Sequence, residues 1–425
     1  MRAKRSAKFL LILALLGLAR QGFGQQNNKL NYVNPFIGTS KSNVPTKWGN
    51  NGGTYPGAVA PSGAVQLTPE TSLTGNRGYD YADSSIYYFS CFNHLSGFPF
   101  GASGRFFIMP VGKQDNFEDG AYSRPFLHRN ERAHPGFYSV VFDDDGTLAE
   151  ATATLRTGLF RFTFKAKQAP RIFIGDTGEL LQQSKRSLHF SNGHTVVNLG
   201  ADVEGIKPVK GGWLLSFPAD PNHQQIIGIQ LSASSVSFAG AQNNLDKEIG
   251  GANFDEVCLQ TSREWAKKLA VIEVRDNSEQ NKTVFYTALY HSLLIPWVIE
   301  DADGQYAGAD GKIQQKSGRH QYGGFSPWDT FRSLNPLLTL LYPEKENDVI
   351  LSMLDVYKQT GHLPTETMTG NHAIAIIVDT YLKGVAGFDK EFAYKAMKSN
   401  IMEAPFVQND MQLYNENGYI PYTRS

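Results

Sequence analysis

The sequence predicts an N-terminal antiparallel β-sandwich followed by a helical barrel, of which only about half is present. Two observations lead to this fold class. From about residue 30 to residue 240, short runs rich in β-branched and aromatic residues alternate with turn signals, which is typical of a large sandwich. From about residue 253 onward, apolar residues recur with a spacing of about 3.6, which is typical of helices. The 425 residues suffice for both domains.

The sandwich is predicted over residues 25–250. Turn-forming sequences separate its strand candidates, for example residues 143–146 (Asp-Asp-Asp-Gly) and 191–193 (Ser-Asn-Gly). The clearest strand candidates are residues 106–111, 137–142, 159–164, 171–175 and 226–231.

Residues 251–280 are predicted to form a linker helix region that contains Trp265, and residues 281–425 to form the partial barrel. A closed α/α barrel needs more helices than these residues supply, and the chain ends at Ser425 without a capped final helix. We therefore expect a C-terminal truncation. The barrel helices are expected at residues 280–295, 327–341, 344–359, 373–383 and 390–401.

Residues 301–306 (Asp-Ala-Asp-Gly-Gln-Tyr) resemble the start of a calcium-binding loop. Such a loop requires a bidentate Glu at its last position, where this sequence has Lys312. We therefore expect a hairpin turn at this place.

The N-terminus has the parts of a secretory signal peptide over residues 1–24. Basic residues between Arg2 and Lys8 precede an apolar run at residues 9–19 that is too short to span a bilayer comfortably, and small residues follow up to Gly24. We expect a periplasmic or secreted protein that does not insert into the membrane after cleavage. No Cys lies near the cleavage site, which argues against a lipid anchor.

The amino-acid composition limits the classes of partner that this protein is expected to bind. The 40 basic and 40 acidic residues balance, so nothing indicates a nucleic acid or an anionic membrane as partner. Aromatic residues make up 12% of the chain, which is common where sugars are bound, although large sandwich cores use them too. The only two cysteines, Cys91 and Cys258, could be a disulfide or two free thiols, and the sequence leaves both open.

Residues 324–332 (Gly-Phe-Ser-Pro-Trp-Asp-Thr-Phe-Arg) contain the first candidate site. Pro327 suits the first turn of a helix, and Ser326 before it is a suitable N-cap. Trp328 and Asp329 then lie in the first turn, where an aromatic face and a carboxylate can hold a sugar ring in a cavity. The alternative is a buried Trp and an Asp placed for the helix dipole.

A second loop-to-helix junction, residues 363–372, carries Glu366, Asn371 and His372. Polar groups at the same end of successive helices fit a barrel with a mouth at one end, and carboxylates beside aromatics suit acid–base chemistry on a sugar bond. The sequence has no HExxH, paired CxxC, GxSxG or phosphate-binding glycine motif. Asn93 and His94 lie in a glycine-rich loop and are either structural or ligand contacts.

Sequence blocks spread along the chain resemble glycoside hydrolase family 92, the calcium-dependent exo-α-mannosidases. Each block is weak alone, but their common order is specific and covers nearly all of the mature chain. The blocks are residues 34–39 (Asn-Pro-Phe-Ile-Gly-Thr), 54–61 (Thr-Tyr-Pro-Gly-Ala-Val-Ala-Pro), 78–81 (Gly-Tyr-Asp-Tyr), 94–97 (His-Leu-Ser-Gly), 135–138 (Pro-Gly-Phe-Tyr), 285–291 (Phe-Tyr-Thr-Ala-Leu-Tyr-His), 328–332 (Trp-Asp-Thr-Phe-Arg) and 368–373 (Met-Thr-Gly-Asn-His-Ala).

The resemblance implies a β-sandwich packed on an (α/α)6 barrel with the active site between them. It implies removal of terminal α-linked mannose with inversion from a mannose-containing glycan of the N-glycan or mannan type. It implies Glu366 as the general acid and Trp328, Asp329, His94, Asn93, Asn371 and His372 as substrate-binding residues. Ca²⁺ is the implied cofactor, bound to vicinal sugar hydroxyls, but no ligand residue for it is assigned.

Two departures from the family pattern matter. Many members carry the acid in an Asn-Glu-Thr set several residues after a Leu-Pro, whereas here Leu363-Pro364 is followed at once by Thr-Glu-Thr. The region expected to hold the catalytic base and most calcium ligands lies beyond Ser425. The alternative to an active mannosidase is therefore a non-catalytic carbohydrate-binding or relic fragment that lacks the base. A phosphorylase or lyase would share the architecture but not the motif series.

Overall fold

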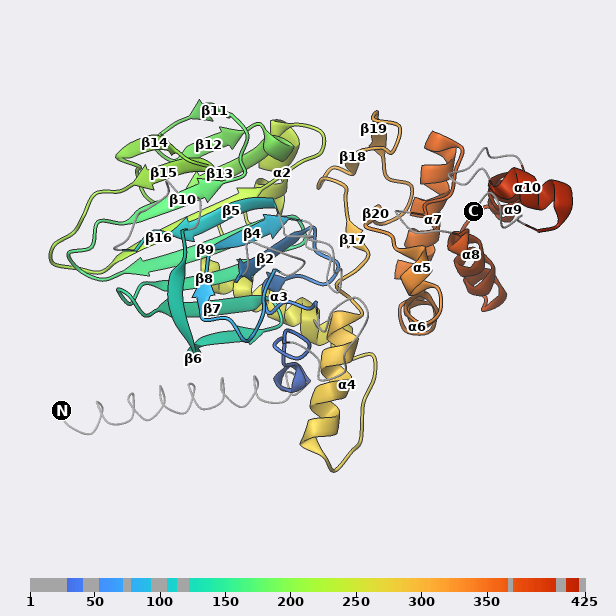
Figure 1. Ribbon diagram of the computed structural model, residues 1–425, viewed down its shortest axis with the longest axis horizontal. Helices are drawn as coiled ribbons and strands as arrows, with labels where there is room; N and C mark the ends of the chain where they lie inside the picture. The colour runs from blue at the N-terminus through green and yellow to red at the C-terminus, as the bar shows by residue number, and fades with distance from the viewer. Residues whose placement is uncertain are drawn as a thin grey trace, which may run out of the picture.

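The computed structural model of the chain describes residues 29–40, 53–71, 78–92, 105–112, 122–365, 370–402 and 410–419. It shows strands gathered on one side and helices on the other, with α2, α3 and α4 between and beneath them (Figure 1). The predicted order of an antiparallel sandwich followed by a helical region is confirmed.

Within the described residues the sandwich consists of two antiparallel sheets, one of seven strands and one of nine. In spatial order the first sheet contains β1 (Ala58–Val59), β2 (Val65–Glu70), β4 (Tyr88–Phe92), β5 (Arg105–Pro110), β10 (Arg171–Gly175), β15 (Gly212–Ser216) and β14 (Gly205–Val209). The second contains β11 (Leu180–Gln183), β12 (Ser187–Phe190), β13 (Thr195–Leu199), β16 (Gln225–Ser232), β9 (Thr157–Phe164), β8 (Leu148–Ala153), β7 (Phe137–Phe142), β6 (Arg124–His134) and β3 (Ser85–Ile86).

The alternation of side chains along each strand explains the core between the sheets. In β9, Phe160, Phe162 and Phe164 are buried, while the residues between them are only half-buried. Phe89 of the opposite sheet meets Phe160 with the ring centroids 5.6 Å apart. Each such phenylalanine stabilises the fold by roughly 2–3 kcal/mol through burial of apolar surface.

Helices and short strands follow the sandwich, whose last strand ends at Ser232. Two short strand pairs, β17 with β20 and β18 with β19, lie between α4 and α5. The helices are η1 (Leu30–Tyr32), η2 (Asn192–His194), α2 (Phe238–Glu248), α3 (Phe254–Leu269), α4 (Glu279–His291), α5 (Pro327–Thr330), α6 (Leu334–Leu341), α7 (Pro343–Thr360), α8 (His372–Leu382), α9 (Lys390–Met402) and α10 (Asp410–Asn417), and the short strands are β17 (Trp297–Val298), β18 (Gln305–Ala307), β19 (Ile313–Gln315) and β20 (Tyr322–Gly323).

Helix α3 joins the sandwich to the helices that follow. It begins with a capping box in which Asn253 and Glu256 satisfy each other's backbone N–H groups. Trp265, fully buried on its inner face, donates its indole N–H to the carbonyl of Val59 at 2.7 Å. The same indole packs on Tyr290 of α4 with the ring centroids 4.4 Å apart. One side chain therefore ties a strand, α3 and α4 together.

The helix predicted at residues 327–341 is wrong as a single element, because the structure divides it into α5 and α6. Pro336 gives the reason. It has no N–H to donate, and its ring would clash with the carbonyl of Arg332, four residues before it, in a continuous helix.

Two smaller expectations are also resolved. Residues 301–304 form the expected turn, in which Gly304 N–H donates to the carbonyl of Asp301 at 2.8 Å and Asp301 N–H donates to that of Gln305 at 2.7 Å. Cys91 and Cys258 are free thiols, the first buried and the second half-buried. The proposed domain boundaries at residues 250 and 280 stay predictions.

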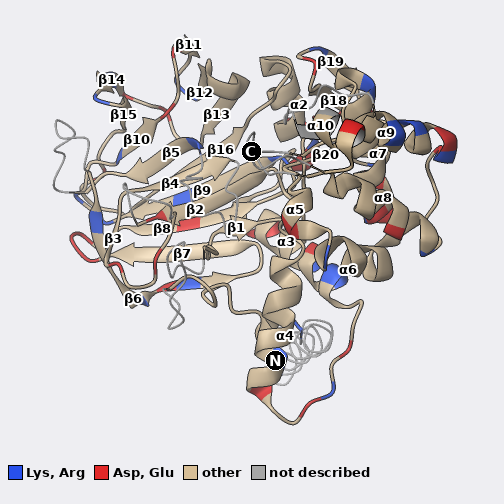
Figure 2. Cartoon of the chain, turned by 45° about the vertical axis from the view of Figure 1, so that its right-hand side comes forward, with Lys and Arg blue, Asp and Glu red and all other residues tan. Residues whose placement is uncertain are grey.

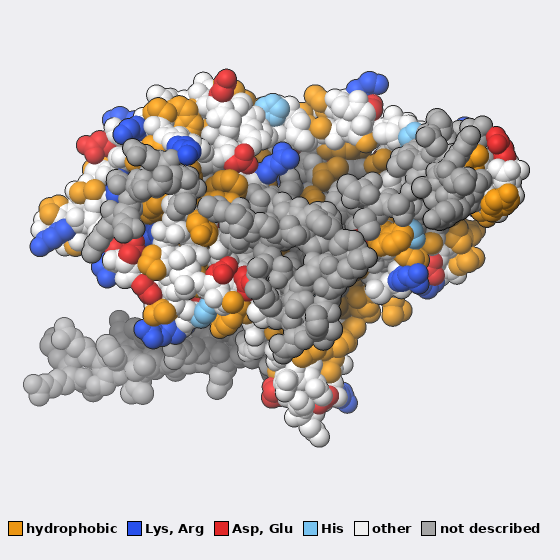
Figure 3. Space-filling view, viewed as in Figure 1, with side chains coloured by type: hydrophobic (Ala, Val, Ile, Leu, Met, Phe, Trp, Pro, Cys, Tyr) orange, Lys and Arg blue, Asp and Glu red, His pale blue; other side chains and the backbone are white. Residues whose placement is uncertain are grey.

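The surface differs between the two parts of the molecule. In the view of Figure 2, basic and acidic side chains are interspersed over strands and helices alike. Apolar side chains gather over the helical region in Figure 3, and Leu340 of α6 and Leu382 of α8 are each 76% exposed. None of the helices within the described residues combines the length and the apolar character needed to cross a membrane.

Candidate functional site

The structure brings the two predicted loop-to-helix junctions together at the N-terminal ends of α5 and α8. The Trp328 and His372 rings lie 5.1 Å apart between centroids, with their planes at 77°. Phe331 packs on the same imidazole at 4.5 Å. Residues 44 positions apart in the sequence thus form one aromatic cluster, whose positions follow from Pro327 starting α5 and Asn371 preceding α8.

Trp328 is 44% exposed, so the alternative of a buried tryptophan is wrong. Asp329 beside it is also exposed, and its carboxylate accepts a hydrogen bond from the hydroxyl of Ser326. Ser326 does not cap α5 with its side chain as predicted, because its hydroxyl donates to this carboxylate instead. The indole and the carboxylate are therefore both open to a ligand.

Asn400 of α9 fixes both ends of the second junction. Its amide N–H₂ donates to Asn371 Oδ1 at 2.5 Å, and its own oxygen accepts the backbone N–H of Leu363 at 3.0 Å. Asn400 is only 1% exposed, so these bonds are shielded from water. One buried side chain thereby sets the distance across residues 363–371, which include the predicted acid.

His372 is held by packing. Its Nδ1 atom is buried and has no hydrogen-bond partner among the described residues. A Cβ added at Gly370, whose φ is +90°, would lie 2.6 Å from His372 Cε1. Glycine is therefore required at this position both by the backbone conformation and by the close approach of the imidazole.

The structure brings some of the predicted site residues together, and others lie outside the described residues. Trp328, Asp329, Asn371 and His372 lie at one end of the helical region, and Trp328 contacts His372 directly. Asn93, His94 and Glu366 lie outside the described residues, as does the signal peptide, so their roles stay predictions. Sequence reasoning missed Asn400, because a lone asparagine in the last turn of a predicted helix carries no local signal of a tertiary contact.

Arg156 in the β8–β9 turn fastens the sandwich to the helical region. Its guanidinium donates to Glu248 Oε1 at 2.7 Å and to Glu300 Oε1 at 2.5 Å, and its Nε donates to the backbone carbonyl of Glu300 at 2.6 Å. The Glu300 side chain is fully buried and lies 2.8 Å from His320 Nδ1. Burial alone would raise the pKa of Glu300, but His320 and Arg156 outweigh it and the pKa is lowered. The buried carboxylate is therefore held in its charged form.

The described residues do not by themselves fit a calcium ion. No group of three or more His, Cys, Asp or Glu side chains converges among them. At the candidate site the carboxylate of Asp329 accepts from Ser326, and Asn371 Oδ1 accepts from Asn400. Calcium takes roughly six to eight oxygen ligands, and these two oxygens do not supply such a set.

The chemistry of the cluster suits a sugar. An exposed indole offers an apolar face to the C–H groups of a pyranose ring, and a carboxylate and an amide beside it hydrogen-bond its hydroxyls. The site is oriented by packing and by Asn400, so little side-chain entropy is lost when a ligand binds.

Two family profiles match nearly the whole chain. The one described as "Glycosyl hydrolase family 92 N-terminal domain" matches residues 32–253, and the one described as "Glycosyl hydrolase family 92 catalytic domain" matches residues 240–425. The first of these alone covers more than half of the chain.

Solved structures and a curated relative agree with the profiles. The GH92 α-mannosidase BT3965 from Bacteroides thetaiotaomicron is 28% identical with a TM-score of 0.81 over 93% of this chain and 60% of that chain. The inverting mannosidase BT2199 from the same bacterium, 24% identical with a TM-score of 0.81 over 94% of this chain and 59% of that chain, supports the fold alone. An uncharacterized secreted glycosidase from Arthroderma benhamiae is 22% identical over 97% of this chain and 58% of its own length.

The chain therefore spans about 60% of the length of these relatives. The sandwich, the helical region behind it and the family motifs all lie within the matched residues. This chain belongs to glycosyl hydrolase family 92.

Proposed function

We propose that this protein is an exported, inverting, calcium-dependent glycoside hydrolase of the α-1,2-mannosidase type that removes terminal mannose from glycans. Family membership supports the reaction. The observation that carries the proposal is the exposed Trp328 beside Asp329, Asn371 and His372 at one end of the helical region. A structure of BT3965, at 29% identity, contains mannoimidazole, which supports a mannose-type substrate for this chain.

Each candidate site residue has a proposed role. Trp328 packs against the sugar ring, while Asp329 accepts hydrogen bonds from its hydroxyls with its orientation set by Ser326. Asn371 and His372 line the same end, and Asn93 and His94 complete the binding site from the sandwich. Glu366 gives a proton to the leaving oxygen. Inversion then requires a water on the opposite face of the ring and a second carboxylate about 6.5–9.5 Å from the first, and we assign no residue to that second role.

Calcium dependence rests on family membership. The ion would supply positive charge to the sugar hydroxyls when bound, and carboxylates and carbonyl oxygens are its preferred ligands. Because the described residues do not form a complete ligand set, the steps proposed for this chain involve its own side chains only.

The test is release of mannose from α-mannobiosides by residues 25–425, with calcium and then with EDTA. Calcium-dependent release supports the proposal. Binding of mannose that quenches Trp328 fluorescence without release would instead support the non-catalytic, carbohydrate-binding alternative. Neither binding nor release by a folded chain would contradict both.

The role of Glu366 has its own test. A general acid contributes about 10²–10⁴-fold to the rate, so Glu366→Gln should slow cleavage of mannobiosides by that factor. It should spare an aryl mannoside whose leaving group needs no proton. The matched control is Glu344→Gln, an exposed position at the start of α7. An equal loss on both substrates would show that Glu366 is not the acid.

A further inference from the structure

A second polar site lies between the sandwich and the helical region. It is a pocket of about 340 Å³ lined by the β1–β2 and β8–β9 turns, one face of α3 and the start of α7. This interdomain pocket is defined here by Ser62, Leu155, Glu264, Lys268, Tyr322 and Lys345. Its size is at the lower end of the range for small-molecule sites, and it shares no lining residue with the site at Trp328.

Lys345 reaches this pocket from the first turn of α7 and is only 8% exposed. Its Nζ donates to Ser62 Oγ at 2.6 Å and to the carbonyl of Pro296 at 3.4 Å, and it lies 5.4 Å from the Tyr322 ring centroid. No carboxylate forms an ion pair with it among the described residues. Burial, together with the charge of Lys268, lowers the pKa of Lys345 to about 7.

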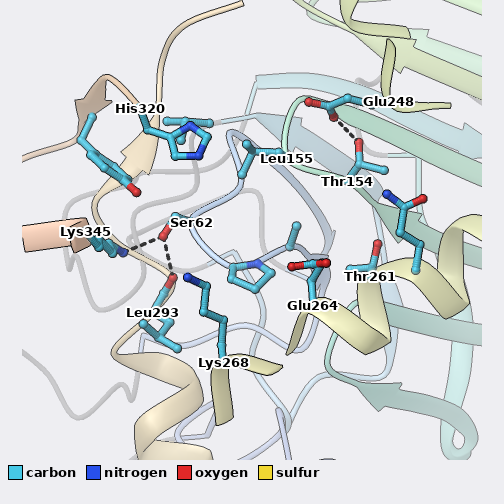
Figure 4. Close-up of a pocket in the computed structure, with 15 residues that line it drawn as sticks. Ser62, Thr154, Leu155, Glu248, Thr261, Glu264, Lys268, Leu293, His320 and Lys345 are labelled. Atoms are coloured by element: carbon cyan, nitrogen blue, oxygen red, sulfur yellow. Dashed lines mark hydrogen bonds between the residues drawn. The ribbon is translucent and has the colours of Figure 1, made fainter. Parts of the chain in front are cut away.

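Lys268 of α3 extends toward the same end of the pocket (Figure 4). Its ammonium takes part in none of the hydrogen bonds or ion pairs between described side chains, and its nearest recorded contact is the Tyr342 ring, whose centroid lies 5.8 Å from Nζ. Two lysines thus line one end of a mostly buried site, and neither forms an ion pair with a described carboxylate, although Glu346 next to Lys345 partly offsets its charge. Like charges at such a place repel each other strongly, because water screens them poorly.

The acidic groups of the pocket do not neutralise this pair. Glu248 is already engaged by the guanidinium of Arg156, which donates to it at 2.7 Å, and by the backbone N–H of Arg156 at 2.8 Å. Glu264 lies one turn before Lys268 on α3 and forms no ion pair with it in the described structure. The lysine end of the pocket is therefore positively charged.

Ser62 shows that this wall is built under strain. Its φ is +57°, which a serine rarely adopts, and its backbone N–H donates to Leu293 at 2.9 Å while its carbonyl accepts from Val298 at 3.0 Å. These bonds aim its hydroxyl at Lys345. Strained non-glycine residues concentrate at functional sites, and here the strain orients a group that faces the pocket.

We propose that the interdomain pocket binds a small oxyanion, either free phosphate or the phosphate group of an ester, between Lys268 and Lys345. The anion neutralises both ammonium groups and accepts hydrogen bonds from them, and Tyr322 lines the same pocket with its ring 5.4 Å from Lys345 Nζ. Because the β1–β2 turn, α3 and α7 all contribute to the wall, a bound anion also stabilises the contact between sandwich and helical region. The site is independent of the proposed hydrolase activity.

The test is thermal unfolding of the full chain in inorganic phosphate against chloride at matched ionic strength. The unfolding temperature should rise with the logarithm of the phosphate concentration above Kd. Lys268→Met should weaken binding at least tenfold, and so should Lys345→Met. The first variant removes no hydrogen bond that the structure records, so a loss of binding in it reports on the anion site and not on the contact between Lys345 and Ser62.

Two further variants sharpen the result. Lys267→Met makes the same change of net charge on the exposed face of α3 and should bind phosphate like the native chain. Glu264→Gln removes a competing negative charge and should bind more tightly. An equal phosphate effect in the Lys268→Met and native chains, or none beyond that of chloride, would overturn the proposal.

Glucose 6-phosphate distinguishes the two sources of the anion. If it binds more tightly than inorganic phosphate and loses affinity in Lys268→Met, the pocket takes a phosphate ester. If inorganic phosphate binds more tightly, with the same loss in the variant, the pocket takes the free ion.

Discussion

The sandwich and the helical region are stabilised in different ways. The sandwich encloses a continuous apolar core in which both sheets contribute phenylalanines such as Phe89, Phe142 and Phe160. The helical region has a smaller apolar core, which includes Val349 and Met353, and it also buries Lys345, Glu346 and Asp348 along the first turns of α7. Strand alternation gives a sheet one apolar face, so a sandwich can complete its core alone, whereas each helix of a barrel needs neighbours on more than one side.

The two parts also differ at their surfaces. Leu340 and Leu382 are each 76% exposed in the helical region, and exposed apolar side chains of this kind favour association. Glu346 is buried between Asn335 and Thr380, and burial raises its pKa to about 7. We therefore expect the helical region to lose structure before the sandwich when the contacts across the domain interface are weakened.

The largest expected effect comes from removing the interface guanidinium. Arg156→Met leaves the fully buried Glu300 carboxylate without its guanidinium partner, with only His320 beside it, which should lower the free energy of unfolding by about 3–5 kcal/mol. Urea unfolding and hydrogen exchange would measure this. The amide of Val349 in α7 should lose protection before that of Phe160 in β9.

The matched control for this change is Arg186→Met. The ion pair of Arg186 with Asp202 is exposed, at 64% and 51% for the two side chains, and such pairs contribute about 1 kcal/mol or less. If the Arg156 variant loses no more stability than this control, or if both regions lose protection together, the interface does not have the role described.

A second substitution, Lys345→Met, tests how the buried lysine of the helical region makes the stability of the fold depend on pH. Between its folded pKa of about 7 and its ordinary value of 10.5, Lys345 binds more protons in the unfolded chain, so stability should rise with pH in that window. Lys345→Met removes this dependence. It should add roughly 3 kcal/mol near pH 7, and the gain should shrink toward pH 10.

Chemical denaturation over this pH range provides the measurement. Lys358→Met, at an exposed position near the end of the same helix, should change stability by about the same small amount at every pH. A Lys345 variant whose gain does not depend on pH would indicate that this lysine is charged in the folded protein throughout.

The smallest effect is expected at the candidate sugar site. Asn400→Ala leaves the buried N–H of Leu363 without an acceptor, which should cost about 1–3 kcal/mol. Amide exchange at Leu363 should accelerate relative to the rest of the helical region. Asn417→Ala, at an exposed position in α10, should change stability by less than about 0.5 kcal/mol. Equal effects of the two changes would argue that Asn400 does not hold Leu363 and Asn371 in place.

Much of the fold could be predicted from local signals. The change of hydrophobic period gave the order of sandwich and helices, and Pro327 marked the start of α5. The break between α5 and α6 was also readable, because Pro336 cannot donate to a carbonyl one turn earlier, but the strong apolar pattern of residues 334–341 outweighed it in the prediction.

The candidate site, too, was predicted only in part from the sequence. Trp328, Asp329, Asn371 and His372 could be named from sequence because each lies next to a helix start, where side chains are free to meet a ligand. Their contact with one another depends on how α5 packs on α8, and no local pattern reports that packing. The ring contact between Trp328 and His372 therefore had to come from the structure.

The sequence by itself determined the two architectures, the positions of most elements and the residues at the helix ends, because periodicity, caps and prolines act within a few residues. The tertiary structure alone decided which polar groups are buried and what they meet. Arg156 reaches Glu300 across 144 residues, Asn400 reaches Leu363 across 37, and Lys345 reaches Ser62 across 283. A side chain's burial depends on the face that a distant segment covers, and that choice is made only when the whole chain packs.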